Sequence, residues 1–298
     1  MKILLLGKRG QVGWELQRSL APLGDIVALS SGSKDHCGDL TNLQGLAETI
    51  RKVKPDIIVN AAAHTAVDKA ESEPELARII NADAVAVLAR EAKLLGAWLL
   101  HYSTDYVFNG VGDDPWTEVD ITGPLSVYGA TKEAGELAIQ TSGCKYLIFR
   151  TSWVYGARGN NFAKTMLRLA SEREMLTVID DQVGAPTGAD LLADVTAHAI
   201  RSVENKPELG GLYHLVAAGE TTWHGYAHFV IEYARKNGHE LKALSESITP
   251  VPSSAFPTPA QRPKNSRLDT RKLETKFNLT LPHWQFGLAR MLTEFLEK

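Results

Sequence analysis

The chain begins MKILLLGKRGQVG (residues 1–13), where a short apolar run leads directly into glycines at positions 7, 10 and 13. The composition of Lys2–Leu6 is typical of a buried parallel strand, and an amphipathic helix is expected over Gln11–Leu23. Glycines at this spacing allow a tight turn, close approach of the backbone to a pyrophosphate, and close helix–strand packing. The helix N-terminus adds amide donors and a partial positive charge. The stretch therefore predicts a dinucleotide-binding turn.

The pattern of short apolar runs alternating with helical segments continues to about residue 150, as in a parallel sheet covered on both faces. Further strands are expected at Ile26–Leu29, Ile57–Asn60, Trp98–Ser103 and Tyr146–Thr151, and further helices at Leu43–Lys52, Leu76–Leu95 and Thr131–Thr141. We predict an α/β fold with a Rossmann-type, doubly wound parallel sheet over residues 1–150, completed by strands near 176–179 and 211–216. Residues 151–298 are expected to form mainly a smaller C-terminal substrate-binding lobe, interleaved with that core.

The composition excludes several classes of protein. The chain has 298 residues, 44% hydrophobic and 22% charged, with a net charge of −3, so nothing favours nucleic-acid binding. The N-terminal apolar run is too short for a signal peptide, and no segment is long enough to span a membrane. Cys37 and Cys144 suggest neither a disulfide framework nor a metal cluster. We therefore expect a cytoplasmic protein.

The end of the second expected strand bears on the choice of coenzyme. Proteins that bind NADH usually carry an acid there for the adenosine ribose, but this chain has Ser30 and no acid before Asp35. Lys8 and Arg9 in the glycine turn are candidates to bind a 2′-phosphate. We predict a preference for NADPH, with NADH use left open; the alternative is that both cations are solvated loop charges.

A candidate catalytic set follows the fourth expected strand. Thr104 stands where that strand ends, and Tyr128 and Lys132 are four residues apart at a helix start, hence on one face. Reduction of a ketone requires a proton donor, and a nearby ammonium lowers the pKa of a phenol toward the working pH. A Tyr-x-x-x-Lys pair alone is mostly structural. Its combination with the glycine turn and Thr104 predicts catalysis.

These motifs together resemble the extended short-chain dehydrogenase/reductase family, from residue 1 to near residue 296. The most specific matching stretches are Gly7–Gly13, Asn60–Glu71, Ser103–Phe108, Tyr128–Lys132, Arg150–Tyr155, Gly184–Thr187 and Arg262–Leu268. The resemblance implies a seven-stranded Rossmann sheet with a small C-terminal substrate lobe. It also implies transfer of hydride from a nicotinamide coenzyme to the C4 keto group of dTDP-4-dehydro-β-L-rhamnose.

The resemblance assigns roles to individual residues. Tyr128 would be the acid, Lys132 its modulator and a coenzyme ligand, and Thr104 the carbonyl anchor. The coenzyme would contact Gly7, Arg9, Gly10, Gln11, Val12, Gly13, Ser30, Asp39, Leu40, Ala63, His64, Thr65 and Tyr102. The dTDP-sugar would contact Thr104, Asp105 and Trp153, with Arg262 and Lys264 as candidates for its phosphates. Trp153 is equally compatible with a core position, and the two cations with a charged surface.

The resemblance further implies a homodimer, with a magnesium ion possible where two chains meet. The matching carboxylates are Glu15, Asp190 and Glu294, although scattered helix acids are more often simple surface residues.

Three other functions fit parts of the same pattern. A dehydratase needs a further acid after the fourth strand, where this chain has Tyr106. An epimerase would keep its coenzyme tightly bound. A non-catalytic nucleotide-binding regulatory subunit would not require the set of Thr104, Tyr128 and Lys132.

Overall fold

The computed structural model describes residues 1–297, and its central feature is a parallel sheet of six strands in the order β2-β1-β3-β4-β5-β10. The strands are β1 (Lys2–Leu6), β2 (Asp25–Leu29), β3 (Ile57–Asn60), β4 (Trp98–Thr104), β5 (Lys145–Thr151) and β10 (Gly211–His214). The chain crosses from one half of the sheet to the other between β2 and β3, so their shared neighbour β1 lies at the switch point where α/β proteins bind ligands. The predicted α/β fold with a Rossmann-type parallel sheet is confirmed.

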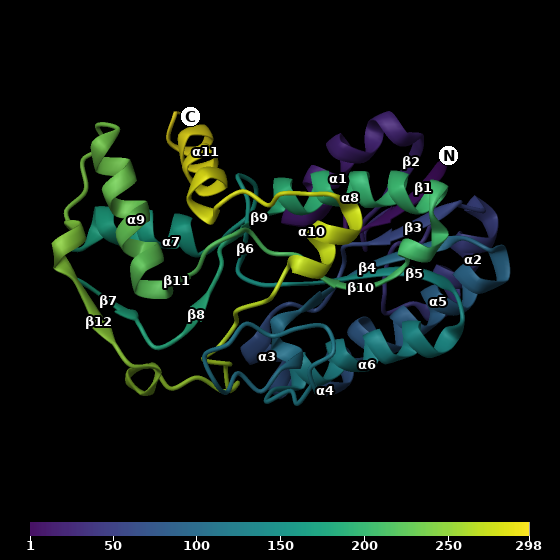
Figure 1. Cartoon of the computed structure of the whole chain (residues 1–298), viewed down its shortest axis with the longest axis horizontal. Coiled ribbons are helices and arrows are strands. Elements are labelled where there is room, and N and C mark those ends of the chain that lie inside the picture. Colours follow the sequence, from purple (N-terminus) through teal and green to yellow (C-terminus); the bar gives the residue numbers. More distant parts are fainter. Residues whose placement is uncertain (298) are drawn as a thin grey trace.

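Helices cover both faces of the sheet, as Figure 1 shows. One face packs against α1 (Gln11–Leu20), α8 (Ala189–Asn205) and α10 (Arg271–Phe277), and the other against α2 (Leu43–Val53), α5 (Ala84–Leu95) and α6 (Val127–Ser142). Strand residues alternate between the two cores: Ile3 and Leu5 face the first, and Leu4 and Leu6 the second. Double-sided burial explains why the strands read as continuous apolar runs.

Two helices differ from the sequence expectation in ways that affect the site. The segment expected as Leu76–Leu95 is divided into α4 (Pro74–Arg78), a π-helical turn (Ile79–Asp83) and α5, preceded by α3 (Val67–Ser72). Helix α6 begins at Val127, four residues before the expected start, because the Ser126 hydroxyl accepts a hydrogen bond from the Gly129 amide. Both Tyr128 and Lys132 therefore lie inside the helix.

The C-terminal lobe has its own core and its own short strands. It contains α7 (Phe162–Glu172), α9 (Trp223–Lys236), α11 (Trp284–Leu296) and the pairs β7 (Leu176–Ile179) with β12 (Ile248–Val251), β8 (Val183–Gly184) with β11 (Thr221–Thr222), and β6 (Val154–Tyr155) with β9 (Thr187–Gly188). The prediction that residues 176–179 complete the central sheet is wrong, because this segment pairs with β12 in the lobe. Pro250 is tolerated in β12 because a two-stranded pair leaves one strand edge unpaired. In the described chain the central sheet thus has six strands rather than seven.

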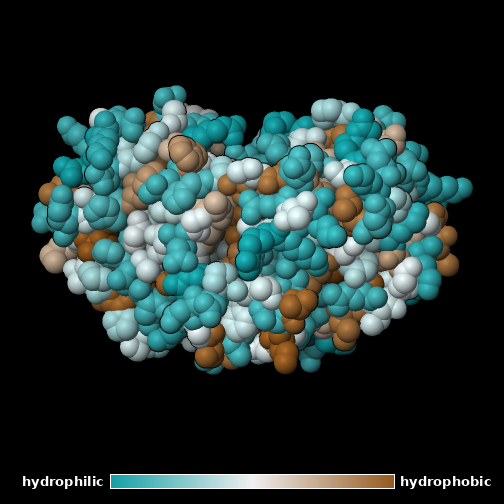
Figure 2. Space-filling view, in the orientation of Figure 1, coloured by the Kyte–Doolittle hydropathy of each residue, from teal (hydrophilic) through white to brown (hydrophobic). Residues whose placement is uncertain are grey.

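The two lobes lie side by side with a notch between them at the top of the view in Figure 2, and much of the visible surface is hydrophilic. Among residues 1–297, no helix combines the length and the apolar character that crossing a bilayer would require.

Candidate active site

The glycine turn between β1 and α1 leaves no room for side chains at two positions. Gly7 has a left-handed φ of 89°, and a Cβ there would lie 2.7 Å from the Ala61 carbonyl carbon. A Cβ on Gly13 would lie 2.1 Å from the Gly7 oxygen. The Gly10 amide bonds to that same oxygen at 3.0 Å and immediately precedes α1. The turn therefore exposes a bare backbone at a helix N-terminus, which suits a pyrophosphate.

Beside this turn, the carboxyl ends of β1, β3, β4 and β5 line a cavity of about 500 Å³. The predicted residues that line it are Gly7, Gly10, Gln11, Val12, Ala63, Thr65, Tyr102, Thr104, Asp105, Tyr128, Lys132 and Trp153. Six predicted coenzyme residues are not among its lining: Arg9, Gly13, Ser30, Asp39, Leu40 and His64. Of these, Arg9 is exposed in the glycine turn, and Asp39 accepts two hydrogen bonds from Thr41 in its own loop.

The predicted catalytic residues meet at one wall of the cavity. Thr104 ends β4, and its Oγ1 accepts a hydrogen bond from the Tyr106 amide at 3.2 Å and donates one to Asp105 Oδ1 at 3.1 Å. The ring of Tyr106 contacts that of Tyr128 edge to face, with centroids 5.4 Å apart. Lys132, one helical turn after Tyr128, donates from Nζ to the Tyr102 carbonyl at 2.6 Å. These contacts hold the phenol and the amine in fixed positions beside Thr104.

Burial is the largest influence on the pKa values of Tyr128 and Lys132. It raises the pKa of Tyr128 to about 12, although the contact with Thr104 acts in the opposite direction. It lowers the pKa of Lys132 to about 8, against the opposing charge of Glu136. The expected lowering of the Tyr128 pKa by the Lys132 ammonium is not found in this structure: burial is the largest cause of the shift, and the contact that opposes it is that with Thr104. The phenol carries its proton throughout the neutral range, as a proton donor must.

Sequence reasoning missed two buried polar residues behind the site. His101 on β4 is fully buried. Its Nε2 lies 2.9 Å from Lys132 Nζ, and its Nδ1 lies 3.1 Å from the side-chain nitrogen Nδ2 of Asn60. Asn81, in the π-helical turn, accepts a hydrogen bond from the His64 amide at 2.8 Å and donates to the His64 carbonyl at 3.1 Å. Polar residues in the middle of otherwise apolar segments were the available signal for both.

Trp153 and Asp105, which line the smaller cavity, occupy energetically unfavourable positions: a strained backbone for the first and a buried carboxyl for the second. Trp153 has a left-handed φ of 48°, unusual for a bulky residue, and its ring stacks on Trp223 with centroids 3.7 Å apart. A Cβ on Gly184 would lie 2.9 Å from the Trp153 ring, so only glycine fits there. Asp105 is buried with Oδ2 lacking a partner among the described residues, and desolvation raises its pKa to about 6. Both features are typical of ligand-binding positions.

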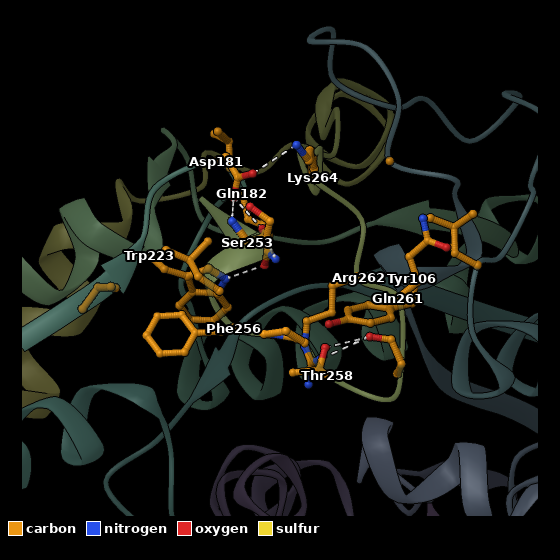
Figure 3. Close-up of a pocket in the computed structure, with 18 of the residues that line it drawn as sticks. Tyr106, Asp181, Gln182, Trp223, Ser253, Phe256, Thr258, Gln261, Arg262 and Lys264 are labelled. Carbon is orange, nitrogen blue, oxygen red and sulfur yellow. Dashed lines mark hydrogen bonds and ion pairs between the residues drawn. The ribbon is translucent and has the colours of Figure 1, made fainter. Parts of the chain in front are cut away.

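A second and larger cavity, of about 1060 Å³, lies between the core and the C-terminal lobe and shares Tyr106 with the site. Figure 3 shows Tyr106 and Arg262 on one side of it, and Asp181 and Trp223 on the other. The predicted phosphate ligands Arg262 and Lys264 both line this cavity rather than the smaller one. Lys264 pairs with Asp181 at 3.0 Å, so the cavity wall carries both charges.

The three carboxylates predicted for magnesium do not form a metal site within one chain. Asp190 is paired with Arg290, and Glu15 lies 3.4 Å from Arg18. Over residues 1–297 there is no group of three or more acidic, histidine or cysteine side chains suited to a metal ion.

Known proteins share this architecture along the whole chain. The dTDP-4-dehydrorhamnose reductase of Salmonella typhimurium LT2 is 65% identical over 294 residues, covering 99% of this chain and 98% of that protein. A crystal structure of a dTDP-4-dehydrorhamnose reductase from Clostridium acetobutylicum, 35% identical, matches with a TM-score of 0.89 and covers 100% of both chains. The Bacillus anthracis enzyme, solved in complex with NADP, is also 35% identical, with a TM-score of 0.87 over 98% of this chain and 99% of that one. Residues 1–297 match the family described as the RmlD substrate binding domain. The family resemblance read from the motifs is thereby confirmed, and the chain belongs to the RmlD substrate-binding-domain family.

Proposed function

We propose that the chain is an NADPH-dependent reductase that converts the C4 keto group of dTDP-4-dehydro-β-L-rhamnose to the alcohol of dTDP-β-L-rhamnose, the last step in the synthesis of that sugar nucleotide. The observation that carries the proposal is the meeting of Thr104, Tyr128 and Lys132 at one cavity beside the glycine turn. The relatives named dTDP-4-dehydrorhamnose reductase supply the substrate class.

The residues of the smaller cavity fit a nicotinamide coenzyme. Three buried hydroxyls at the ends of β4 and β5, those of Ser103, Thr151 and Ser152, have no partner within the described chain and belong to residues that line this cavity. The glycine turn would bind the pyrophosphate, and these hydroxyls are available to the polar groups of the nicotinamide end. NADPH, when bound, supplies the hydride.

The side chains of the site provide the proton. Tyr128, protonated at every working pH, donates its proton to the carbonyl oxygen as that oxygen gains charge. Thr104 turns its hydroxyl proton from Asp105 to the same oxygen and holds it by a hydrogen bond, and the Lys132 ammonium stabilises the phenolate that Tyr128 becomes.

The larger cavity is the proposed site for the nucleotide part of the substrate. Its volume and the cations Arg262 and Lys264 suit a nucleoside diphosphate. Trp153 and Asp105, which line the smaller cavity, are positioned to contact the sugar between the two spaces. Stacking of the indole on a sugar face and hydrogen bonds to the carboxylate would orient C4 toward Tyr128.

The proposal is tested by NADPH oxidation with dTDP-4-dehydro-β-L-rhamnose, for the natural chain and for Tyr128→Phe. We expect kcat to fall on the order of 100-fold or more, because the general acid is lost. Tyr233→Phe removes a hydroxyl that bonds Thr293 in the C-terminal lobe, and this control should keep full activity. NADPH binding without turnover by the natural chain would instead identify a regulatory subunit.

The proposal extends to a cytoplasmic homodimer. Trp14 on α1 is half exposed beneath the Arg158 guanidinium, and Phe286 on α11 is 74% exposed, which favours a contact through these helices. Light scattering would give the mass in solution. The proposed dimer includes no magnesium ion, because Arg18 and Arg290 of the same chain already pair with Glu15 and Asp190.

A further inference from the structure

A series of buried, hydrogen-bonded polar side chains extends from the end of β3 to Lys132 on α6. The Ala62 amide donates to Asn60 Oδ1 at 3.1 Å, and the Asn60 Nδ2 group lies 3.1 Å from His101 Nδ1. On its other side, His101 Nε2 lies 2.9 Å from Lys132 Nζ. All three side chains are at most 1% exposed.

The hydrogen-bond donors in this series of side chains determine which ring nitrogen of His101 carries the proton. Because the Ala62 amide requires an acceptor, Asn60 turns its oxygen toward that amide and its NH₂ group toward His101. His101 Nδ1 must then accept, and a neutral imidazole that accepts at Nδ1 carries its proton on Nε2. Burial and the neighbouring Lys132 charge keep the pKa of His101 well below its usual range, so the ring is neutral.

This arrangement places an N–H group against the amine of Lys132. A neutral amine accepts that hydrogen bond with its lone pair while still donating to the Tyr102 carbonyl. A protonated Lys132 has no lone pair, so it faces a donor unless the imidazole moves its proton to Nδ1. That change would set an N–H group against the Asn60 NH₂ group and lose a buried hydrogen bond.

We infer that His101 is a positioning residue of the reaction: Asn60 favours the proton on Nε2 of the imidazole, and this N–H group fixes the neutral amine of Lys132 in place and makes the lysine release its proton more readily. The inference rests on the proposed reductase function for its kinetic consequence alone. Lys132 would then change charge close to the working pH, and loss of its ammonium would set the alkaline limit of activity.

Glu136 on the same helix is the charged group that acts on Lys132, and the titratable side chains of Tyr102, Asp105, Tyr106 and Tyr128 line the same cavity. Glu136 favours the ammonium, but it is bound by Arg150 at 2.6 Å, which offsets much of its charge. Burial lowers the pKa of Lys132 to about 8, in the same direction as the histidine contact.

The first test uses the whole chain without coenzyme and does not depend on activity. Nitrogen-15 NMR of the histidine rings distinguishes the two tautomers, and His101→Gln identifies the His101 signals by their loss. We expect the proton on Nε2 at alkaline pH, and a shift toward Nδ1 as Lys132 becomes protonated. A proton fixed on Nδ1 at all pH values, or a doubly protonated ring near pH 7, would overturn the inference.

The second test compares pH profiles of kcat/KM. Gln at position 101 offers a carbonyl oxygen to the ammonium, so the alkaline limit should rise by about one pH unit, the effect of one hydrogen bond to a charged group. The matched control is His214→Gln, a second fully buried histidine on strand β10 of the same sheet, whose ring bonds the Trp116 carbonyl. An unchanged limit in His101→Gln, or an equal shift in both variants, would contradict the inference. If the reductase proposal itself fails, the NMR result still decides.

Discussion

Arg262 Nη2 lies 2.6 Å from Asp68 Oδ2, and its Nη1 lies 3.1 Å from Asp68 Oδ1, so two parallel bonds join the proline-rich loop to helix α3. The guanidinium also donates to the Ala260 carbonyl at 3.3 Å, within its own loop. Its hydrogen bonds lower the pKa of Asp68, which stays ionised. The pair fixes one wall of the larger cavity relative to the core, so the binding of the nucleotide part of the substrate should depend on it.

Arg262→Lys keeps the charge but loses the planar pair of bonds. We expect KM for the sugar nucleotide to rise about tenfold, equivalent to about 1.4 kcal/mol, while KM for NADPH changes little. Steady-state kinetics with each substrate varied in turn measures both values. Arg168→Lys, in an exposed pair with Glu172 on α7, is the matched control and should have no effect. A fall in kcat with both KM values unchanged would show that the pair acts on chemistry instead.

Asn81 links the loop after β3, at His64, to helix α6, which carries Tyr128 and Lys132. Besides its two bonds to the His64 backbone, its amide nitrogen lies 3.2 Å from Thr131 Oγ1 on α6. Asn81→Ala leaves both backbone groups of His64 without these partners, so we expect a loss of about 2–4 kcal/mol in the free energy of unfolding and a higher KM for NADPH. Chemical denaturation and coenzyme titration measure these effects. Asn205→Ala, at the exposed end of α8, should change neither. Lower stability with normal NADPH binding would limit Asn81 to a structural role.

The predictable parts of this molecule were those set by local pattern. The boundaries of β1 and β3 follow from apolar runs that end in small or polar residues, and Lys2–Leu6 and Ile57–Asn60 were predicted as observed. Gly7 and Gly13 were predictable because their roles depend only on the turn that they occupy. Likewise, the four-residue spacing of Tyr128 and Lys132 places them on one helix face.

The missed parts depend on contacts between distant segments. The pairing of β7 with β12 joins residues about 70 positions apart, and no pattern in Leu176–Ile179 separates it from a strand of the main sheet. The rise in the Tyr128 pKa comes from burial by the complete fold, which spacing alone does not reveal. In the sequence, His101 lies within an apolar segment and was predicted only as part of a strand. Its contact with Lys132 forms only when β4 and α6 pack together.

Arg9 remains the candidate for coenzyme selection. It is exposed in the glycine turn, directly before Gly10, where a 2′-phosphate on the adenosine ribose would attract it. We expect Arg9→Ala to lower kcat/KM for NADPH about tenfold and to leave that for NADH nearly unchanged. Arg201→Ala, an exposed arginine paired with Glu204 on α8, is the control. Equal losses with both coenzymes would mean that Arg9 does not distinguish them.

Asp105 makes the stability of the protein depend on pH in a direction that can be calculated. Its pKa is about 6 in the folded chain, against an ordinary 3.8, because burial disfavours the carboxylate. A raised folded pKa stabilises the fold fully below the unfolded value, and this contribution is lost as the pH rises through about 6. Ionisation of Asp105 should therefore cost about 2–3 kcal/mol of folding free energy by pH 7.5.

Asp105→Asn should remove that cost, because the amide stays neutral. We expect the variant to match the natural chain in stability near about pH 3, to exceed it increasingly between about pH 4 and about pH 6, and to keep a constant advantage above that range, in urea denaturation of the chain without ligands. The same variant should bind the sugar nucleotide more weakly at pH 7.5, since it lacks the charged acceptor that the natural chain has formed by then. A constant stability difference at all pH values would show that folding leaves the pKa of Asp105 near its ordinary value. In that case its buried oxygen would have to be stabilised by the fold itself, and the carboxylate would be available to the sugar across the whole range.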